Sequence, residues 1–236
     1  CVLTAEYGCE NVRSITPADV KKKVAVIGGG PAGLEAARVA ALRGHSVTLF
    51  ERETELGGQL NLACLPPRKS EMRRATQDLI HALQRAGVRL CLGCMVTEQQ
   101  LLDEKFDAVI VAVGAHNAAP AIPGKENINV ADAWSVLAGR EQVYGKVAVI
   151  GGGLVGSETA ELLAEQGCHV SVIEMMDKIA AAESTTILPT LMESFKAHGV
   201  QQFPGHKVKQ FTTDAVICEN KDGAEVTIPC DYIVLA

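Results

Sequence analysis

Two glycine clusters, each directly after a short apolar run, are the residues of this sequence best suited to holding a phosphorylated ligand. The segment Lys23–Gly30 reads Lys-Val-Ala-Val-Ile-Gly-Gly-Gly, and the same residues recur as Lys146–Gly153. Over the 30 positions that start at these two lysines, 15 residues are identical at a constant offset of 123. A period this long does not fit a solenoid, whose repeats are about 20–50 residues long. It indicates two copies of one nucleotide-binding unit.

The glycines of each copy have the spacing Gly-x-Gly-x-x-Gly. In this pattern the first glycine makes a tight turn, the second lets the backbone approach a pyrophosphate, and the third lets a helix pack on a strand. The free N–H groups and the dipole at the helix N-terminus favour an anion there. We therefore expect a pyrophosphate to be bound by Gly28, Gly30, Pro31, Ala32 and Gly33 in the first copy, and by Gly151, Gly153, Leu154, Val155 and Gly156 in the second.

A glutamate closes the second apolar run of each copy, Glu51 in the first and Glu174 in the second. Each lies 18 residues past the third glycine of its copy, close to the spacing of about 20 at which an acid binds the adenosine ribose. A single Gly-x-Gly-x-x-Gly predicts little, but here strand, glycines, helix, strand and acid all occur twice. We expect one dinucleotide in each copy; the alternative is a pair of decayed units that bind nothing.

The elements that must position these residues alternate in type, which is typical of a parallel sheet covered by helices. Short β-branched runs predict buried strands, the longer segments between them predict helices, and Gly44 and Gly167 stand where helix-ending glycines belong. Two further strands are expected, a buried one within Phe106–Gly114 that ends in a glycine turn, and Asp231–Ala236. The repeated strands are predicted at Val24–Ile27, Val47–Phe50, Val147–Ile150 and Val170–Ile173, and the helices at Leu34–Arg43 and Leu154–Gln166.

The composition favours a folded chain that binds small molecules. Apolar residues make up 47% of the 236 positions and charged residues 21%, so the chain can form a core and is not disordered. The net charge of −6 and the lack of a basic tract argue against nucleic acid or an anionic membrane as partner. No apolar run approaches the ~20 residues of a membrane span, and no signal peptide opens the chain. A cytoplasmic location is therefore expected.

The eight cysteines could suggest a disulfide framework, but their positions argue against one. Cys91, Cys168, Cys218 and Cys230 fall in or beside strand-like runs, where cysteine acts as a small hydrophobe. Cys91 and Cys94 form a Cys-x-x-Cys pair, yet they lie in a strand and turn away from both places where flavoprotein disulfide reductases carry their pair. We expect no disulfide exchange.

The motifs together resemble a family. Gly-Gly-Gly-Pro-Ala-Gly, a terminal glutamate, Leu-Gly-Gly-Gln and Ala-x-Gly after a strand are similar to the FAD half of the two-dinucleotide-fold flavoprotein reductases. Gly-Gly-Gly-Leu-Val-Gly-Ser-Glu-Thr-Ala-Glu is similar to their NAD(P)H half. With Ile15–Asp19, Gly57–Ala63 and Pro66–Pro67, nearly the whole chain resembles the C-terminal module of the NADH:flavin oxidoreductase family, which includes the 2-enoate reductases, the 2,4-dienoyl-CoA reductases and trimethylamine dehydrogenase.

The resemblance implies further site residues. Positions that contact FAD in the family are matched here by Arg52, Gly58, Gln59, Lys69, Val96, Ala112 and Gly114, in addition to the first glycine loop and Glu51. Arg68 could replace Lys69 as a phosphate partner, and the alternative for both is a solvated loop. Glu158 matches a glutamate near the nicotinamide and flavin rings; the alternative is a role in helix solubility or capping.

The resemblance also implies what would surround this chain in a longer protein. In the family a TIM barrel with FMN precedes the module, and a four-iron four-sulfur cluster has its last cysteine just before it, where Cys1 stands. We therefore expect Cys1 to be a cluster ligand, with a terminal cysteine of no role as the alternative. A later Gly-Asp segment closes the FAD site in the family, so we expect the chain to be cut at both ends and its FAD site to be incomplete.

The second copy favours NADH over NADPH. Glu174 would repel a 2′-phosphate, and Met175, Met176 and Asp177 follow it where an NADP site carries an arginine. Lys178 is the only nearby cation in the sequence.

The sequence therefore predicts two Rossmann-like three-layer α/β dinucleotide-binding domains. Residues 1–22 would lead in from an iron–sulfur region, 23–125 would form the FAD-binding domain and 126–236 the NAD(H)-binding domain. Hydride would pass from NADH to FAD, and electrons would then pass through the cluster to FMN, which reduces an activated C=C bond of a small-molecule substrate. No catalytic acid or base is expected. Two alternatives for the full-length protein are an amine dehydrogenase with structural ADP in the first site and a simple NADH oxidase. Homo-oligomerisation of the full-length protein stays open.

Overall fold

The computed structural model describes residues 7–118, 120–127 and 129–236, which form two compact units. The first unit contains the described residues up to Cys64 together with Lys69–His116. The second contains Leu65–Arg68 and Asn117–Ala236. Each unit holds one of the two glycine loops.

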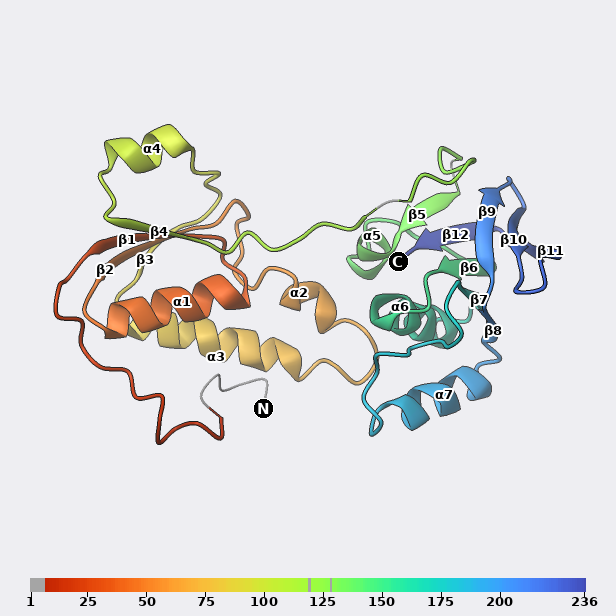
Figure 1. Cartoon of the computed structure of the whole chain (residues 1–236), viewed down its shortest axis with the longest axis horizontal. Helices are drawn as coiled ribbons and strands as arrows, with labels where there is room; N and C mark the ends of the chain where they lie inside the picture. Colours follow the sequence, from red (N-terminus) through yellow and green to blue (C-terminus); the bar gives the residue numbers. More distant parts are fainter. Residues whose placement is uncertain (1–6, 119, 128) are drawn as a thin grey trace. The chain divides into compact units, whose positions relative to one another are not determined.

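The first unit is a parallel four-stranded sheet with helices on both faces (Figure 1). Its strand order is β3-β2-β1-β4, and α1 and α3 lie together on one face while α4 lies on the other. The elements are β1 (Lys23–Ile27), α1 (Pro31–Leu42), β2 (Ser46–Phe50), α2 (Leu60–Ala63), α3 (Met72–Arg85), β3 (Arg89–Cys91), α4 (Glu98–Asp103) and β4 (Ala108–Val111).

The second unit combines a parallel five-stranded sheet of order β5-β12-β6-β7-β8 with an antiparallel three-stranded sheet of order β11-β10-β9. Helices α5, α6 and α7 complete it (Figure 1). The elements are β5 (Val130–Asp132), α5 (Ala133–Leu137), β6 (Lys146–Ile150), α6 (Leu154–Glu165), β7 (His169–Glu174), α7 (Leu188–Ala197), β8 (Gln201–Pro204), β9 (Lys207–Phe211), β10 (Ala215–Glu219), β11 (Glu225–Pro229) and β12 (Tyr232–Leu235).

Successive side chains of a strand point to opposite faces of its sheet. Each strand therefore contributes alternate side chains to the cores on the two faces of its sheet. In the first unit, Val24 and Val26 of β1 pack with Leu34 of α1 and Leu83 of α3. In the second unit, Val147 and Val149 of β6 join the helical side, whereas Ala148 between them joins a core that includes side chains of the antiparallel sheet. The α/β fold class predicted from the sequence is confirmed.

The predicted repeat elements are present with small shifts of their ends. Helix α6 begins at Leu154 as expected, but α1 begins at Pro31 rather than Leu34. The earlier start has a physical reason, because a proline at the first helical position has its φ already fixed for the helix and loses no hydrogen bond there. Gly44 and Gly167 follow the ends of α1 and α6 with φ of 91° and 92°, a conformation that favours glycine.

The prediction of a buried strand within Phe106–Gly114 is wrong about its burial. It forms β4, but Val109 is 43% and Val111 68% exposed. The reason lies in the sheet order, since β4 is an edge strand that pairs only with β1 among the described residues. By contrast β12, in the predicted segment Asp231–Ala236, lies between β5 and β6 and its central residues are buried.

The described cysteines are all free thiols. Cys168, Cys218 and Cys230 are buried, as expected of small hydrophobes, while Cys91 in β3 is half-buried. Burial raises the pKa of Cys218 and of Cys230 to about 11, so both thiols are protonated at neutral pH and unreactive.

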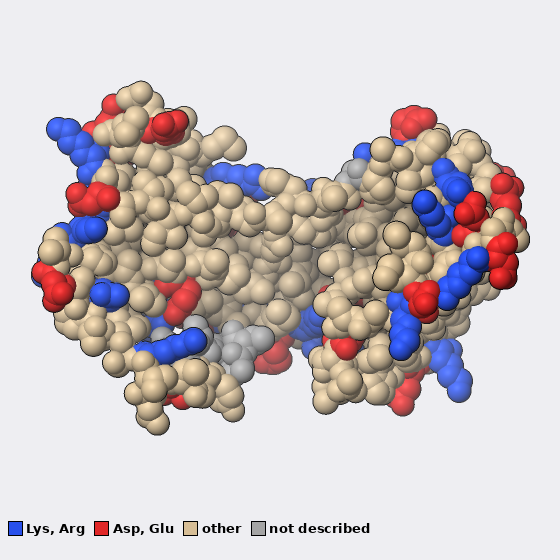
Figure 2. Space-filling model, in the orientation of Figure 1, with Lys and Arg blue, Asp and Glu red and all other residues tan. Residues whose placement is uncertain are grey.

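The surface carries charges of both signs. On the face drawn in Figure 2, basic and acidic side chains are interspersed over the second unit. Among the helices of the described residues, none has the length and apolar character needed to cross a membrane.

Candidate dinucleotide-binding sites

Each glycine loop lies at the carboxyl end of the first strand of its repeat. Gly28 follows β1 with φ 107°, and Gly151 follows β6 with φ 100°. A Cβ on Gly151 would lie 2.7 Å from the carbonyl oxygen of Ala236, and one on Gly28 would collide with the carbonyl oxygen of Ala112. The third glycines, Gly33 and Gly156, would collide with the carbonyl oxygens of Gly28 and Gly151 in the same way. Close backbone packing therefore requires glycine at both positions of each loop.

The second glycine of each loop is different, because the space beside it is open. Gly153 caps α6, and a Cβ there would meet no heavy atom within 4 Å. Gly30 caps α1, and a Cβ there would meet only the Cα of Gly58, at 3.9 Å. This is the position at which a pyrophosphate approaches the backbone, and the free N–H groups of the helix N-terminus lie beside it. The glycine loops therefore fit a bound pyrophosphate.

The two terminal glutamates have the same hydrogen bonds at equivalent positions. In the first unit, one carboxylate oxygen of Glu51 accepts from the N–H of Gly29 at 2.5 Å and the other from the N–H of Glu53 at 2.9 Å. In the second unit, Glu174 accepts from the N–H groups of Gly152 and Met176, both at 2.7 Å. A carboxylate has about four acceptor positions. Each glutamate therefore has capacity left for the two hydroxyls of a ribose.

The middle glycine of each loop is a site residue that the sequence analysis missed. A Cβ on Gly29 would lie 2.5 Å from a methyl group of Leu56 and 2.9 Å from Glu51 Oε2. A Cβ on Gly152 would lie 2.9 Å from the Cβ of Glu174. Glycine lets the acid approach the loop closely enough to accept its N–H. The signal was present, since all three glycines recur unchanged.

The other residues predicted around the first loop lie close to it. Gly58 has φ 53°, and a Cβ there would come within 2.9 Å of Gly30 Cα. The side chain of Gln59 donates to the carbonyl oxygen of Ala115 at 3.0 Å, and Gly114 lies beside this amide. Ala112 donates its N–H to Ile27 at the end of β1. The structure thus brings these segments together at the carboxyl edge of the first sheet.

The remaining predicted residues lie at the following places. Arg52 is exposed and pairs with Glu53 at 3.1 Å. Lys69 precedes α3, and Val96 lies in the loop between β3 and α4, half-buried. Glu158 is half-buried on α6. Cys1, the predicted cluster ligand, lies outside the described residues.

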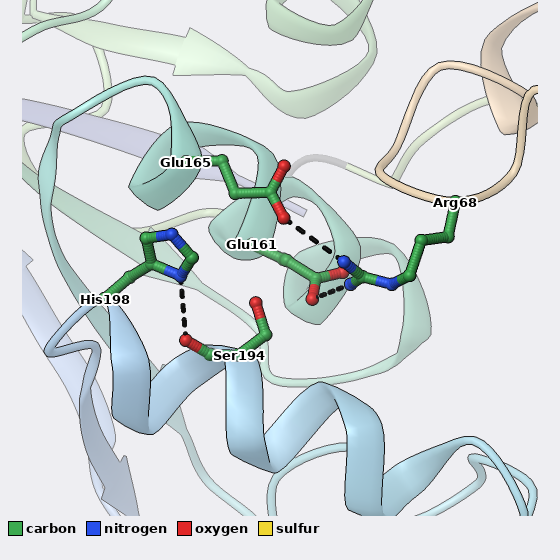
Figure 3. Close-up of polar contacts among 5 residues, drawn as sticks. All are labelled: Arg68, Glu161, Glu165, Ser194 and His198. Atoms are coloured by element: carbon green, nitrogen blue, oxygen red, sulfur yellow. Dashed lines mark hydrogen bonds and ion pairs between the residues drawn. The ribbon is translucent and has the colours of Figure 1, made fainter.

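Arg68, a candidate phosphate partner, instead forms ion pairs within the second unit. Its guanidinium points at α6, where it pairs with Glu161 and, at 3.2 Å, with Glu165 (Figure 3). The Glu161 side chain is only 5% exposed, so Arg68 balances a buried charge. Ser194 and His198, drawn beside them, make a separate contact in which His198 Nδ1 lies 2.9 Å from the Ser194 carbonyl oxygen. Nothing in the sequence pattern indicated the ion pair of Arg68.

The Cys91–Cys94 turn lies beside Glu51, because Glu51 donates its N–H to Cys91 and accepts from the N–H of Cys94 at 2.8 Å. The pair is therefore next to the glutamate predicted to bind a ribose in the first unit, and both thiols are free.

A second repeated contact was also missed by sequence reasoning. Asp107 precedes β4 and accepts the N–H of Lys23, the first residue of β1, at 2.7 Å. Asp231 precedes β12 and accepts the N–H of Lys146, the first residue of β6, at 2.7 Å. These contacts fix the register of β4 and β12. They thereby fix Ala112 and Ala236 against the glycine loops. The aspartates could have been found by extending the repeat comparison past the first strand–helix–strand segment.

Comparison with known proteins places this geometry in a family. The sequence pattern of the family described as pyridine nucleotide-disulphide oxidoreductase matches residues 22–236. The chain belongs to this family. It is 56% identical over 236 residues to a bilirubin reductase of Mediterraneibacter gnavus and 39% identical over 241 residues to an NADH oxidase of Thermoanaerobacter brockii. Both alignments cover 100% of this chain and 37% of the relative.

A solved structure gives the same result. The chain resembles a 2-naphthoyl-CoA reductase in complex with 2-naphthoyl-CoA, with a TM-score of 0.93 and 29% identity over 100% of this chain and 36% of that one. The resemblance to reductase modules of larger flavoproteins is thus confirmed. The chain is a module of a flavin-dependent pyridine nucleotide oxidoreductase, and it spans little more than a third of the length of these relatives.

Proposed function

We propose that the first unit binds FAD and the second binds NADH, so that the module collects electrons from NADH. The observation that carries this proposal is the matching pair of glutamates, each held by two backbone N–H groups beside an open helix N-terminus. Glu51 and Glu174 would bind the adenosine riboses, and the glycine loops the pyrophosphates. When bound, FAD accepts a hydride from NADH and can release the electrons one at a time.

The preference for NADH rests on the charges around Glu174. Met175 and Met176 follow it with exposed side chains, so the positions next to the acid carry no cation. Lys221 lies 2.7 Å from Asp177 and lowers the pKa of that carboxyl, so this lysine is already paired with an acid. Lys178 remains as an exposed cation in the same turn. A 2′-phosphate beside Glu174 would therefore meet a carboxylate with little positive charge to compensate it.

The larger activity is proposed from the relatives. We propose that in a longer protein the electrons pass through a four-iron four-sulfur cluster to FMN and reduce an activated C=C bond. The similarity to a bilirubin reductase and to a 2-naphthoyl-CoA reductase supports a reductase acting on an unsaturated organic compound. The similarity to an NADH oxidase supports the rival reading, in which the module feeds an oxidase. Both readings need the same NADH site.

The experiment measures thermal stabilisation by NADH and NADPH. A ligand at 100 times its dissociation constant stabilises the native state by about 2.7 kcal/mol. For a chain of this size that raises the melting temperature by roughly 5–10 °C. NADH should reach this shift in melting temperature at concentrations where NADPH gives a much smaller shift. Glu174→Ala should narrow the difference between the two nucleotides, because it weakens NADH binding and removes the repulsion between the carboxylate and the 2′-phosphate. Equal stabilisation of the unmodified protein by the two nucleotides would contradict the assignment of Glu174.

A further inference from the structure

The Cys-x-x-Cys pair of the first unit, Cys91 and Cys94, is a motif that the proposed dinucleotide sites do not use. Both thiols are free and half-buried, so a small polar molecule can reach them. By contrast, Cys218 and Cys230 are buried, and burial raises the pKa of each to about 11. The thiolate is the reactive form of cysteine, and burial in apolar surroundings disfavours it. Thiol chemistry is therefore favoured at the pair over these two buried thiols.

The backbone holds the two cysteines on either side of a bulge opposite Glu51, the residue after β2. Glu51 donates its N–H to the carbonyl oxygen of Cys91 at 2.9 Å, and its own carbonyl oxygen accepts the N–H of Cys94 at 2.8 Å. In a regular parallel pair, the two residues that flank one partner residue in this way are two positions apart. Here they are three positions apart, so Leu92 and Gly93 together form a bulge with one extra residue.

The bulge brings the two cysteine side chains to the same face. Residues that occupy alternate places of a strand point to one face and have Cα atoms about 6.6 Å apart. This separation lies at the upper end of the range of roughly 4.4–6.8 Å over which a disulfide forms. The exposure agrees, since Leu92 is 43% exposed and Gly93 is exposed, whereas Cys91 and Cys94 are both half-buried. Gly93 has φ 64°, a conformation that favours glycine and permits the bulge.

We propose that Cys91 and Cys94 form a reversible oxidation site, at which hydrogen peroxide converts the two thiols into a disulfide. The thiolate of one cysteine attacks peroxide, so that an S–O bond forms, the O–O bond breaks and hydroxide leaves. The second thiol attacks the sulfenic acid that results, and water leaves as the S–S bond forms. The two sulfurs lose two electrons, and one peroxide becomes two waters. The electrons pass to peroxide, so this reaction differs from catalytic exchange with a disulfide substrate.

Closure of the disulfide should change the first dinucleotide site through the backbone of Glu51. The bond requires Cβ atoms about 3.8 Å apart, closer than those of alternate residues in a strand, so the bulge must tighten. The bulge holds the segment that carries the acid, since Gly93 also donates its N–H to the carbonyl oxygen of Glu53 at 2.9 Å. Tightening should move these groups away from Glu51 and weaken FAD binding. This effect on FAD rests on the proposed function, whereas the oxidation itself does not.

Peptide mapping tests the oxidation site. Trypsin would release both cysteines in one peptide, residues 90–105, which contains no other cysteine. After treatment with peroxide and alkylation in denaturant, this peptide should be lighter by two hydrogen atoms and should resist alkylation until dithiothreitol is added. Cys94→Ser removes one of the two thiols and should abolish the disulfide. Cys9→Ser, at another half-buried thiol of the first unit, is the matched control and should leave the disulfide unchanged.

Measurements on the reduced and the oxidised protein test the effect on Glu51. FAD affinity, followed by flavin fluorescence, should fall about tenfold on oxidation, the effect of one lost hydrogen bond. NADH affinity, measured by calorimetry, should stay within twofold, because the second unit contains neither cysteine. Amide hydrogen exchange at Glu51 needs no cofactor and should become about tenfold faster, since this N–H donates to Cys91. In Cys94→Ser, peroxide should change each of these quantities less than twofold.

The outcomes separate this proposal from the proposed function. If peroxide leaves both thiols of residues 90–105 open to alkylation, the oxidation site is wrong. If the disulfide forms but changes neither the hydrogen exchange of Glu51 nor the affinity for FAD, the coupling to Glu51 is overturned. If the reduced protein binds no FAD, the proposed function of the first unit fails, and peptide mapping and hydrogen exchange still decide the oxidation site and its coupling.

Discussion

The backbone holds in position the two glutamates that we propose as ribose ligands, Glu51 and Glu174. Glu51 is only 8% exposed, and both of its carboxylate oxygens accept backbone N–H groups, as do those of Glu174. Because the carboxylates are already oriented, less conformational entropy is lost when a ribose binds.

Two adjacent glycines of the second loop allow stability and binding to be separated. In Gly152→Ala the new Cβ would lie 2.7 Å from a methyl group of Ile179 and 2.9 Å from the Cβ of Glu174, so overpacking should cost about 1–3 kcal/mol of unfolding free energy. In Gly153→Ala the Cβ meets open space, so the protein should fold normally but bind NADH more weakly, since the methyl group blocks the pyrophosphate.

Urea unfolding followed by the fluorescence of Trp134 would measure the stability of these two variants. Trp134 is the single tryptophan of the chain and lies in α5, so its signal reports on the second unit. Normal NADH affinity in Gly153→Ala would show that the pyrophosphate does not lie at this helix N-terminus.

At the scale of elements, each glycine loop depends on a strand far away in the sequence. Ala112 after β4 and Ala236 after β12 pack against the first and third glycines of their loops. The strands are kept in register by Asp107 and Asp231, which accept the N–H of the first residue of β1 and β6. Each glycine loop therefore reaches its observed geometry only once the distant strand has paired.

Helix α6 also depends on a distant element, the segment Leu65–Arg68. Arg68→Ala would leave Glu161 buried without a cation, which should cost about 1–3 kcal/mol of unfolding free energy. Arg68 has φ 64°, and alanine there bears the same backbone strain, so the loss reports on the ion pair. Arg52→Ala, at an exposed pair, should change stability by less than about 0.5 kcal/mol.

Trp134 fluorescence in urea is again the measurement for Arg68. Glu161→Gln added to Arg68→Ala should recover part of the stability, because it removes the unpaired buried charge. A single Arg68→Ala variant as stable as the unmodified protein would mean that the contact contributes nothing.

At the scale of the whole molecule, the two units should bind two different cofactors independently. Glu51→Ala should lower FAD affinity and leave that for NADH within twofold, and Glu174→Ala should do the reverse. Loss of the ribose hydrogen bonds should weaken the affected cofactor by about 10- to 100-fold. Flavin fluorescence on titration with FAD and calorimetry with NADH measure the two affinities. If Glu51→Ala weakened NADH and spared FAD, the assignment of cofactors to units would be reversed.

The amino-acid sequence by itself determined the local part of both sites. Spacing and residue type predicted the repeated strands β1, β2, β6 and β7, the helices α1 and α6, the glycine loops and the terminal glutamates. These features depend on backbone conformation within about 30 residues. The repeat of this pattern made a chance match improbable and led to the correct family.

Only the tertiary structure decided what joins residues far apart in the chain. The pairing of Arg68 with Glu161 and the contacts of the aspartates that fix β4 and β12 depend on chain segments that meet only after folding. The apolar pattern of β4 predicted a strand, but not that the strand would lie exposed at an edge. A strand's burial depends on its neighbours in the sheet, and its own residues do not specify them.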